Sequence, residues 1–128
     1  MKTPESIVFL MVVTLSPGIA SANDGKTLFD TQCTGCHQLG HNAYGPDLCG
    51  LTGRRAGTAV GYSYTQAMKD AGIVWNRESL QRFLRSPQTV VPGTRMGIIG
   101  FEDKNHRESI ASYLLQVSHS SKACRQNR

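Results

Sequence analysis

The residue types best suited to chemistry lie close together in the segment QCTGCHQ, which contains Cys33, Cys36 and His37. Three chemistries use two cysteines at this spacing: thiol–disulfide exchange, zinc binding and covalent attachment of a c-type haem. Each of them requires something different of the surrounding chain, so the neighbouring sequence has to decide between them.

Two of these chemistries are disfavoured by the context. An exchange motif of the thioredoxin type follows a buried strand in a βαβ unit, and no such strand precedes Cys33. A structural zinc ion needs four ligands, for which His41 would have to be the fourth. Cys36 and His37 are neighbours, and neighbouring side chains on a helix point about 100° apart. They would not converge easily on one tetrahedral ion.

The third chemistry accounts for every residue of the motif. In Cys-x-x-Cys-His, two thiols one helical turn apart can each add to a vinyl group of the same porphyrin. The next residue then lies beneath the ring, where its imidazole reaches the iron. The sequence therefore predicts one covalent haem c, attached through Cys33 and Cys36, with His37 as the proximal iron ligand.

A haem iron in an electron carrier usually needs a sixth ligand, and a methionine thioether favours the ferrous state. Beyond the N-terminal segment the methionines are Met68 and Met96. Met68 falls within a predicted helix, where a gap-filling core methionine is the simpler interpretation. Met96 lies in a loop pinned by Pro92 and Gly93, and a loop can present its side chain to the open face of the ring. Met96 is the predicted distal ligand.

The N-terminal segment has the pattern of an export signal. Lys2 precedes an apolar run over residues 7–15, and small residues at 20–22 resemble a cleavage site. The run is too short to span a membrane. We predict a cleaved signal peptide over residues 1–22, with an uncleaved anchor as the alternative. Export implies a periplasmic location, where thiols tend to oxidise.

Length and charge limit the remaining possibilities. The 128 residues suffice for one small domain, predicted over residues 23–118. The formal net charge is +5, but Lys122, Arg125 and Arg128 carry three of these charges in a polar basic tail over 119–128. A mildly basic, exported body is a poor candidate for nucleic-acid binding. No nucleophile–base or carboxylate pair stands out, so neither an enzyme nor a small-molecule substrate is expected.

Helical periodicity and caps predict an all-α fold of short helices and long loops. Helices are expected from Asp24 into the cysteine motif, over residues 65–71, from Asn76 to a stop at Pro87, and after a cap at Asp103. The stretch 38–64 is rich in Gly, Pro, Asn and Thr, and so long a loop is uncommon unless it wraps something. Since short helices alone are marginal, we expect the chain to wrap around one haem.

At this point the chain resembles the class I cytochromes c, of the mitochondrial and related bacterial type. The likeness covers residues 25–117 and rests on the segments GKTLFDTQCTGCHQL, GPDLCGLTGRRAG, VGYSYTQAMKDAGIVW, LRSPQTVVPGTRM and IASYLL. They occur in family order and spacing, apart from a slightly shortened loop between His37 and Gly45.

The resemblance implies roles for residues outside the motif. The carbonyl of Pro46 should orient His37, which fits the need of a ligating imidazole for an acceptor. Arg54, Tyr64 and Trp75 should surround one haem propionate, and Thr94 should lie near the other. The terminal helices should cross where Gly25 and Phe29 meet Ile110 and Tyr113.

Several residues depart from the family pattern. Phe83 and Met68 stand where the family often has tyrosine and asparagine, which implies a drier haem pocket, and Ile98 replaces a frequent aromatic residue. Several lysines around the haem edge are also missing. Their places are taken by Gln32, Gln88, Glu102 and Asp103, which leaves Lys26, Arg82, Arg85 and Arg95 as candidates for a docking face.

Cys49 and Cys124 have no haem role. In the family fold the loop that holds Cys49 lies near the end of the last helix, so the resemblance implies a disulfide between them. The alternative is two free thiols.

The resemblance also implies the function: a soluble periplasmic protein, expected to be a monomer, that carries single electrons through its haem. Its donor would be a membrane quinol-oxidising complex or a dehydrogenase. Its acceptor would be a terminal oxidase, a reductase or a photosynthetic reaction centre. Two alternatives stay open: a haem enzyme or gas- or peroxide-binding haem protein whose Met96 is labile, and a haem module dedicated to one oxidoreductase.

Overall fold

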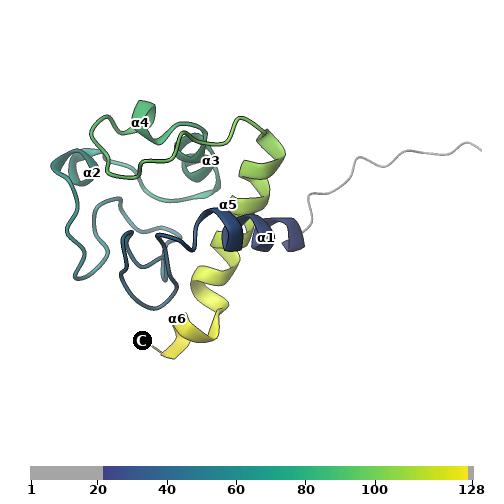
Figure 1. Cartoon of the computed structure of the whole chain (residues 1–128). Coiled ribbons are helices and arrows are strands. Elements are labelled where there is room, and N and C mark those ends of the chain that lie inside the picture. The colour runs from purple at the N-terminus through teal and green to yellow at the C-terminus, as the bar shows by residue number, and fades with distance from the viewer. Residues whose placement is uncertain (1–21, 127–128) are drawn as a thin grey trace, which may run out of the picture.

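A computed structural model describes residues 22–126, which fold into helices joined by long loops (Figure 1). The helices are α1 (Ala22–Gln32), α2 (Gln66–Asp70), α3 (Arg77–Arg85), α4 (Pro87–Val90), α5 (Lys104–Ser120) and α6 (Lys122–Gln126). Across this described range, strand-like pairing amounts to one isolated bridge between Arg55 and Val74. The predicted all-α fold is confirmed. Apart from Ala22, the predicted signal peptide lies outside the described residues.

The predicted caps at Asn76 and Asp103 are found. At α3, the side chain of Asn76 accepts from the backbone N–H of Ser79, whose hydroxyl accepts in turn from the backbone N–H of Asn76. At α5, the Asp103 carboxylate accepts from the N–H groups of Asn105 and His106. These acceptors satisfy donors that the first turn of a helix cannot pair internally. No helix among residues 22–126 is both long and apolar enough to cross a membrane.

The structure corrects the predicted start of the first helix and adds two details. α1 begins at Ala22, so Asp24 lies in its first turn and is not its cap; a carboxylate there still interacts favourably with the helix dipole. Pro87 stops α3, as predicted, but also begins the short helix α4, because its fixed φ suits a first helical position. The predicted tail contains the end of α5 and the whole of α6.

The terminal helices α1 and α5 cross in close contact, as the resemblance implies (Figure 1). A Cβ on Gly25 would overlap the carbonyl oxygen of Ser109 and lie 2.8 Å from Cβ of Tyr113, so only glycine permits this approach. The rings of Phe29 and Tyr113 lie 5.5 Å apart, and Ile110 is fully buried. The crossing fixes the direction in which α1 enters the cysteine motif.

The helix α3 also packs against α5. Its buried apolar residues are Leu80, Phe83 and Leu84, and the ring of Phe83 lies 5.1 Å from that of Trp75. At the surface of this contact, Glu108 on α5 accepts from Arg77 and Gln81 on α3. The loop over residues 33–65 therefore begins at the end of α1, and the loop over residues 91–103 ends at the start of α5.

Candidate functional site

The cysteine motif continues directly from the last turn of α1. The N–H of Cys33 donates to the carbonyl of Phe29 (2.9 Å), and the N–H groups of Cys36 and His37 donate to the carbonyl of Cys33 (3.0 and 2.8 Å). Cys33 is half-buried, Cys36 is exposed, and both are free thiols that are not bonded to each other. The helix thus presents two thiols and an imidazole at the start of the long loop.

The imidazole of His37 is oriented by the backbone that follows. Its Nδ1 lies 3.1 Å from the carbonyl oxygen of Pro46, and since a carbonyl can only accept, Nδ1 carries the proton. Gly45 backs the ring so closely that a Cβ there would lie 2.6 Å from Nδ1. Burial lowers the pKa of His37 below its usual value, and the Pro46 hydrogen bond opposes that shift. The ring is neutral at pH 7, with Nε2 left to bind a metal.

The protonation of Cys33 bears on the choice between haem attachment and thiol exchange. Burial raises the pKa of the Cys33 thiol to about 11, and the neighbouring Cys36 adds to the increase. A nucleophilic exchange cysteine needs the opposite, a lowered pKa that supplies thiolate at neutral pH. The microenvironment of the motif therefore argues against a thioredoxin-like function.

Arg54 reaches from the long loop into the interior with one nitrogen unpaired. Its two terminal nitrogens donate to the carbonyls of Cys49 (2.7 Å) and Asp47 (2.9 Å). Among the described residues, its Nε is the one buried side-chain nitrogen or oxygen without a hydrogen-bond partner. Because a buried N–H of a charged group is costly to leave unpaired, the arrangement requires an acceptor that the chain does not provide.

Tyr64 and Trp75 lie in the same region as Arg54. Burial raises the pKa of Tyr64, while the charge of Arg54 acts in the opposite direction, which places the two side chains in one electrostatic environment. Trp75 is buried, and its backbone N–H donates to the carbonyl of Arg54 (2.9 Å). The three residues that the resemblance assigns to one propionate are therefore neighbours.

The loop that carries Met96 is held by its own side chains. Met96 is half-buried against the core, and its N–H donates to the hydroxyl of the buried Thr94 (3.2 Å). The amide of Gln88 donates to the carbonyls of Thr94 (2.8 Å) and Met96 (3.4 Å). Arg95 donates to the carbonyl of Ser63 in the opposite loop. Together these contacts set the path of the backbone at Met96.

Met68 differs from Met96 in its surroundings. It is buried within α2, where its N–H is capped by the hydroxyl of Thr65. Phe83 is equally buried and packs on Trp75. These positions agree with the interpretation of Met68 as a core residue.

Two residues matter here in ways that the sequence analysis did not anticipate. Asp47 accepts from the N–H groups of Gly40 and Cys49 (both 2.9 Å) and so shapes the loop that holds Arg54. An aspartate side chain that accepts from the N–H two residues later is typical of an Asx turn, so the spacing of Asp47 and Cys49 in the sequence could have indicated this turn. Gln88 stands where the resemblance implies a docking lysine, and nothing in the sequence indicates that its amide reaches the Met96 loop.

Cys49 and Cys124 are joined by a disulfide, the pairing that the resemblance implies. Their sulfurs lie 1.93 Å apart and their Cα atoms 5.2 Å apart, across 75 residues of sequence. Cys124 is buried on α6, so the bond fastens the middle of the long loop to the C-terminal end of the chain.

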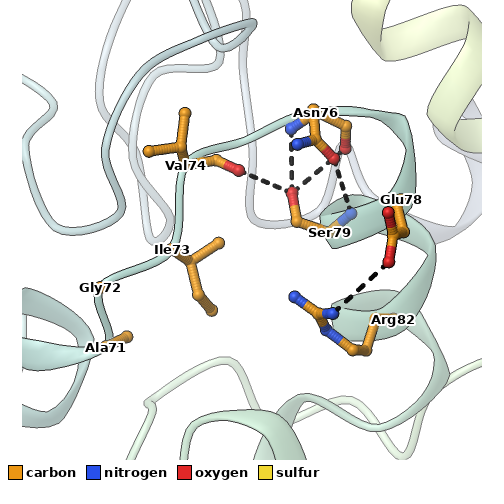
Figure 2. A pocket seen from close by; sticks show the side chains of 8 residues that line it. All are labelled: Ala71, Gly72, Ile73, Val74, Asn76, Glu78, Ser79 and Arg82. Atoms are coloured by element: carbon orange, nitrogen blue, oxygen red, sulfur yellow. Dashed lines mark hydrogen bonds and ion pairs between the residues drawn. The ribbon is translucent and has the colours of Figure 1, made fainter.

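An open hollow of about 390 Å³ lies between α2 and α3 (Figure 2). Its polar groups are paired with one another: the hydroxyl of Ser79 donates to the carbonyl of Val74, and Arg82 lies 3.8 Å from Glu78. Such a surface offers a ligand no unpaired buried group. The haem-related residues described above lie elsewhere and are not among those that line it.

The residues fit a covalently bound haem on three observations of this structure. Two free thiols stand one helical turn apart, the adjacent histidine has one ring nitrogen tied and the other available, and a buried Arg54 nitrogen lacks an acceptor that a propionate would supply. The fold and these residues define an all-α protein that holds its haem through a Cys-x-x-Cys-His motif.

Comparison with known proteins gives the family. The family model described as cytochrome c matches residues 22–118. The chain is 45% identical over 95 residues to cytochrome c of Euglena viridis, covering 73% of this chain and 93% of the relative. It is 43% identical over 93 residues to cytochrome c2 of Rhodopila globiformis, covering 71% and 88%. Among solved structures, cytochrome cH from Methylobacterium extorquens matches with a TM-score of 0.71 and 35% identity, covering 74% of this chain and 97% of that one. The chain belongs to the cytochrome c family, whose members bind one covalent haem c and carry electrons.

Proposed function

We propose that this protein is a soluble periplasmic carrier of single electrons, whose haem c is attached through Cys33 and Cys36 and ligated by His37 and Met96. When bound, the haem supplies the one-electron couple between ferric and ferrous iron. The chain's own residues would attach the group through Cys33 and Cys36, bind its iron through His37 and Met96, and exclude water from it. No bond of the protein needs to rearrange when an electron is transferred.

The observation that carries this proposal is the setting of His37. Its Nδ1 proton is committed to Pro46 and its ring is backed by Gly45, immediately after two free thiols. A histidine that is neutral, fixed in one tautomer and fixed in direction is prepared to bind a metal through Nε2. The propionate roles proposed for Arg54, Tyr64, Trp75 and Thr94 are supported by the unpaired Arg54 nitrogen and by the burial of Trp75 and Thr94.

The proposed periplasmic location is supported by the disulfide between Cys49 and Cys124. Disulfides persist in oxidising compartments and are rare in reducing ones. The export pattern of residues 1–22 points to the same location.

The proposed partners are redox proteins: a quinol-oxidising complex or dehydrogenase as donor, and an oxidase, reductase or photosynthetic reaction centre as acceptor. Electron transfer of this kind needs a short-lived encounter through a small interface. Ile99, which is 96% exposed three residues after Met96, offers an apolar contact beside the proposed haem edge. Few basic residues remain around the proposed haem edge, so docking should depend little on charge.

Optical spectroscopy of the purified, exported protein tests the proposal. We expect a haem that survives denaturation and solvent extraction, because thioether bonds hold it. The ferric form should show the near-infrared charge-transfer band of a methionine–iron bond, and the ferrous form should not bind carbon monoxide. A missing band together with rapid carbon monoxide binding would favour the alternative of a gas- or peroxide-binding haem protein with a labile Met96. A colourless folded protein would contradict the proposal altogether.

A further inference from the structure

The loop from Asp47 to Leu51 is fastened to the C-terminal helices at two points. Cys49 is bonded to Cys124 of α6, and the N–H of Gly50 donates to the carbonyl of Ser118 near the end of α5 (2.9 Å). The side chains of Leu48 and Leu51 on either side are buried in the core. A loop in the middle of the sequence is thereby held against the last two helices.

The same loop holds the guanidinium of Arg54. Its carbonyls at Asp47 and Cys49 accept from the two terminal nitrogens of Arg54, at 2.9 and 2.7 Å. The planar guanidinium has its donors in a fixed geometry, so two fixed acceptors also fix the direction of its Nε–H. Nε is buried and has no partner among the described residues.

One residue therefore belongs to both arrangements. Cys49 supplies the sulfur of the disulfide and also the carbonyl that lies closest to Arg54. The N–H of Cys49 is held by the carboxylate of Asp47, so the peptide groups on both sides of this residue are constrained. Any displacement of Cys49 moves a hydrogen-bond acceptor of the guanidinium, and hydrogen bonds weaken steeply when their geometry is lost.

We propose that the Cys49–Cys124 disulfide is a positioning element for Arg54: by fixing the carbonyls that hold the guanidinium, it aims the buried Nε–H at a haem propionate and sets part of the haem potential. The proposal rests on the proposed function. A cation near the haem favours the ferrous iron, which carries one positive charge less than the ferric iron. If the guanidinium of Arg54 is no longer held toward the propionate, the midpoint potential of the haem should therefore fall.

A double-mutant cycle on the holoprotein separates this role from simple stabilisation. Potentials are measured for the wild type, the pair Cys49→Ser with Cys124→Ser, Arg54→Leu, and all three changes together. We expect the serine pair to lower the potential by part of the shift that Arg54→Leu causes, and to cause no further shift when Arg54 is already leucine. Coupling of this kind is what a shared contact produces and independent sites do not.

Tyr113→Ala is the matched control. It removes the ring that packs on Phe29 at the crossing of α1 and α5, changes no charge and leaves the Arg54 loop intact. It should lower stability, with no shift of the potential comparable to that of the serine pair. If the serine pair lowers stability but leaves the potential unchanged, or shifts it equally in both Arg54 backgrounds, the positioning role is wrong.

Reduction of the wild-type bond supplies a second route to the same state. A dithiol such as dithiothreitol gives two electrons and two protons to the bond, becomes a cyclic disulfide itself, and leaves two cysteine thiols for alkylation. The holoprotein with this disulfide opened and alkylated should show the same lowered haem potential as the serine pair. If neither form folds, the bond is a structural staple and the positioning role is overturned. The wild type's methionine band and carbon monoxide test report on the proposed function separately, so the two failures are distinguishable.

Discussion

Met96 lies in a loop whose path is determined by single side chains on both sides of it. Gln88 is the informative one, because its amide donates to the carbonyls of Thr94 and Met96 from an exposed position. The family resemblance suggested only that a docking lysine was lost here. The geometry indicates instead that the residue restrains the backbone that presents the proposed distal ligand.

Replacement of Gln88 tests this restraint. Gln88→Met keeps the length of the side chain and removes the donor, whereas Gln88→Lys keeps a donor. A net hydrogen bond contributes about 0.5–1.5 kcal/mol, so Gln88→Met should increase opening of the loop by about two- to tenfold. The rate at which an added ligand such as imidazole displaces Met96 from ferric iron measures this opening. Gln88→Lys should stay close to the wild type; equal rates for all three proteins would contradict the restraint.

Among the helices, the crossing of α1 and α5 decides where the haem motif begins. Gly25 brings the backbone of α1 against Ser109, and α1 then runs without interruption into Cys33. A residue that takes no part in chemistry thus sets the position of those that do.

Gly25→Ala should force the two helices apart. The added Cβ would overlap the backbone oxygen of Ser109, which cannot rotate away. Overpacking of this kind costs about 1–3 kcal/mol, and denaturant unfolding of the holoprotein measures it. Gly35→Ala is the control, because a Cβ there meets nothing within 4 Å in the chain. Equal stability of the two variants would show that the helices adjust without cost.

The cap of α5 should be sensitive to pH. Hydrogen bonds from the backbone N–H groups of His106 and Asn105 hold the pKa of Asp103 below its usual value of 3.8. Since the folded-state pKa is the lower one, the stabilisation is present above about pH 4 and is lost as pH falls through the folded value. Asp103→Asn keeps an acceptor oxygen but does not titrate, so it should flatten this part of the stability-against-pH curve. An unchanged curve would contradict the cap's contribution.

At the scale of the whole molecule, the sequence predicts the parts that local chemistry determines. Asn76 and Asp103 cap their helices as expected, because a cap needs only a side chain and the next three residues. Arg54 shows what the sequence cannot supply. The resemblance implies a place near a propionate. The hydrogen bonds of Arg54 to the carbonyls of Cys49 and Asp47, however, depend on a loop that a disulfide joins to α6, far along the chain.

The distribution of charge over the molecule leads to a last prediction. Of the four basic residues left near the proposed haem edge, two lie beside a carboxylate: Lys26 is paired with Asp30, and Arg82 lies 3.8 Å from Glu78. Pairing weakens the local positive field that would attract an anionic partner. The protein should therefore react with a small anionic oxidant at a rate that changes little with salt, in spite of its formal net charge of +5.

Removing the carboxylates of Asp30 and Glu78 should strengthen the positive electrostatic potential near Lys26 and Arg82. Asp30→Asn and Glu78→Gln together should raise the rate of oxidation of the ferrous protein by ferricyanide severalfold at low ionic strength. The increase should disappear near 1 M salt, where the screening length falls to about 3 Å. Stopped-flow measurements across ionic strengths give both results. Glu108→Gln removes a carboxylate that is paired with Arg77 at the α3–α5 contact, and it should give a smaller increase than either Asp30→Asn or Glu78→Gln alone, although each changes the net charge by the same amount. An equal increase would mean that the reaction responds to total charge alone, and a rate that no variant changes would show that encounter does not depend on these residues.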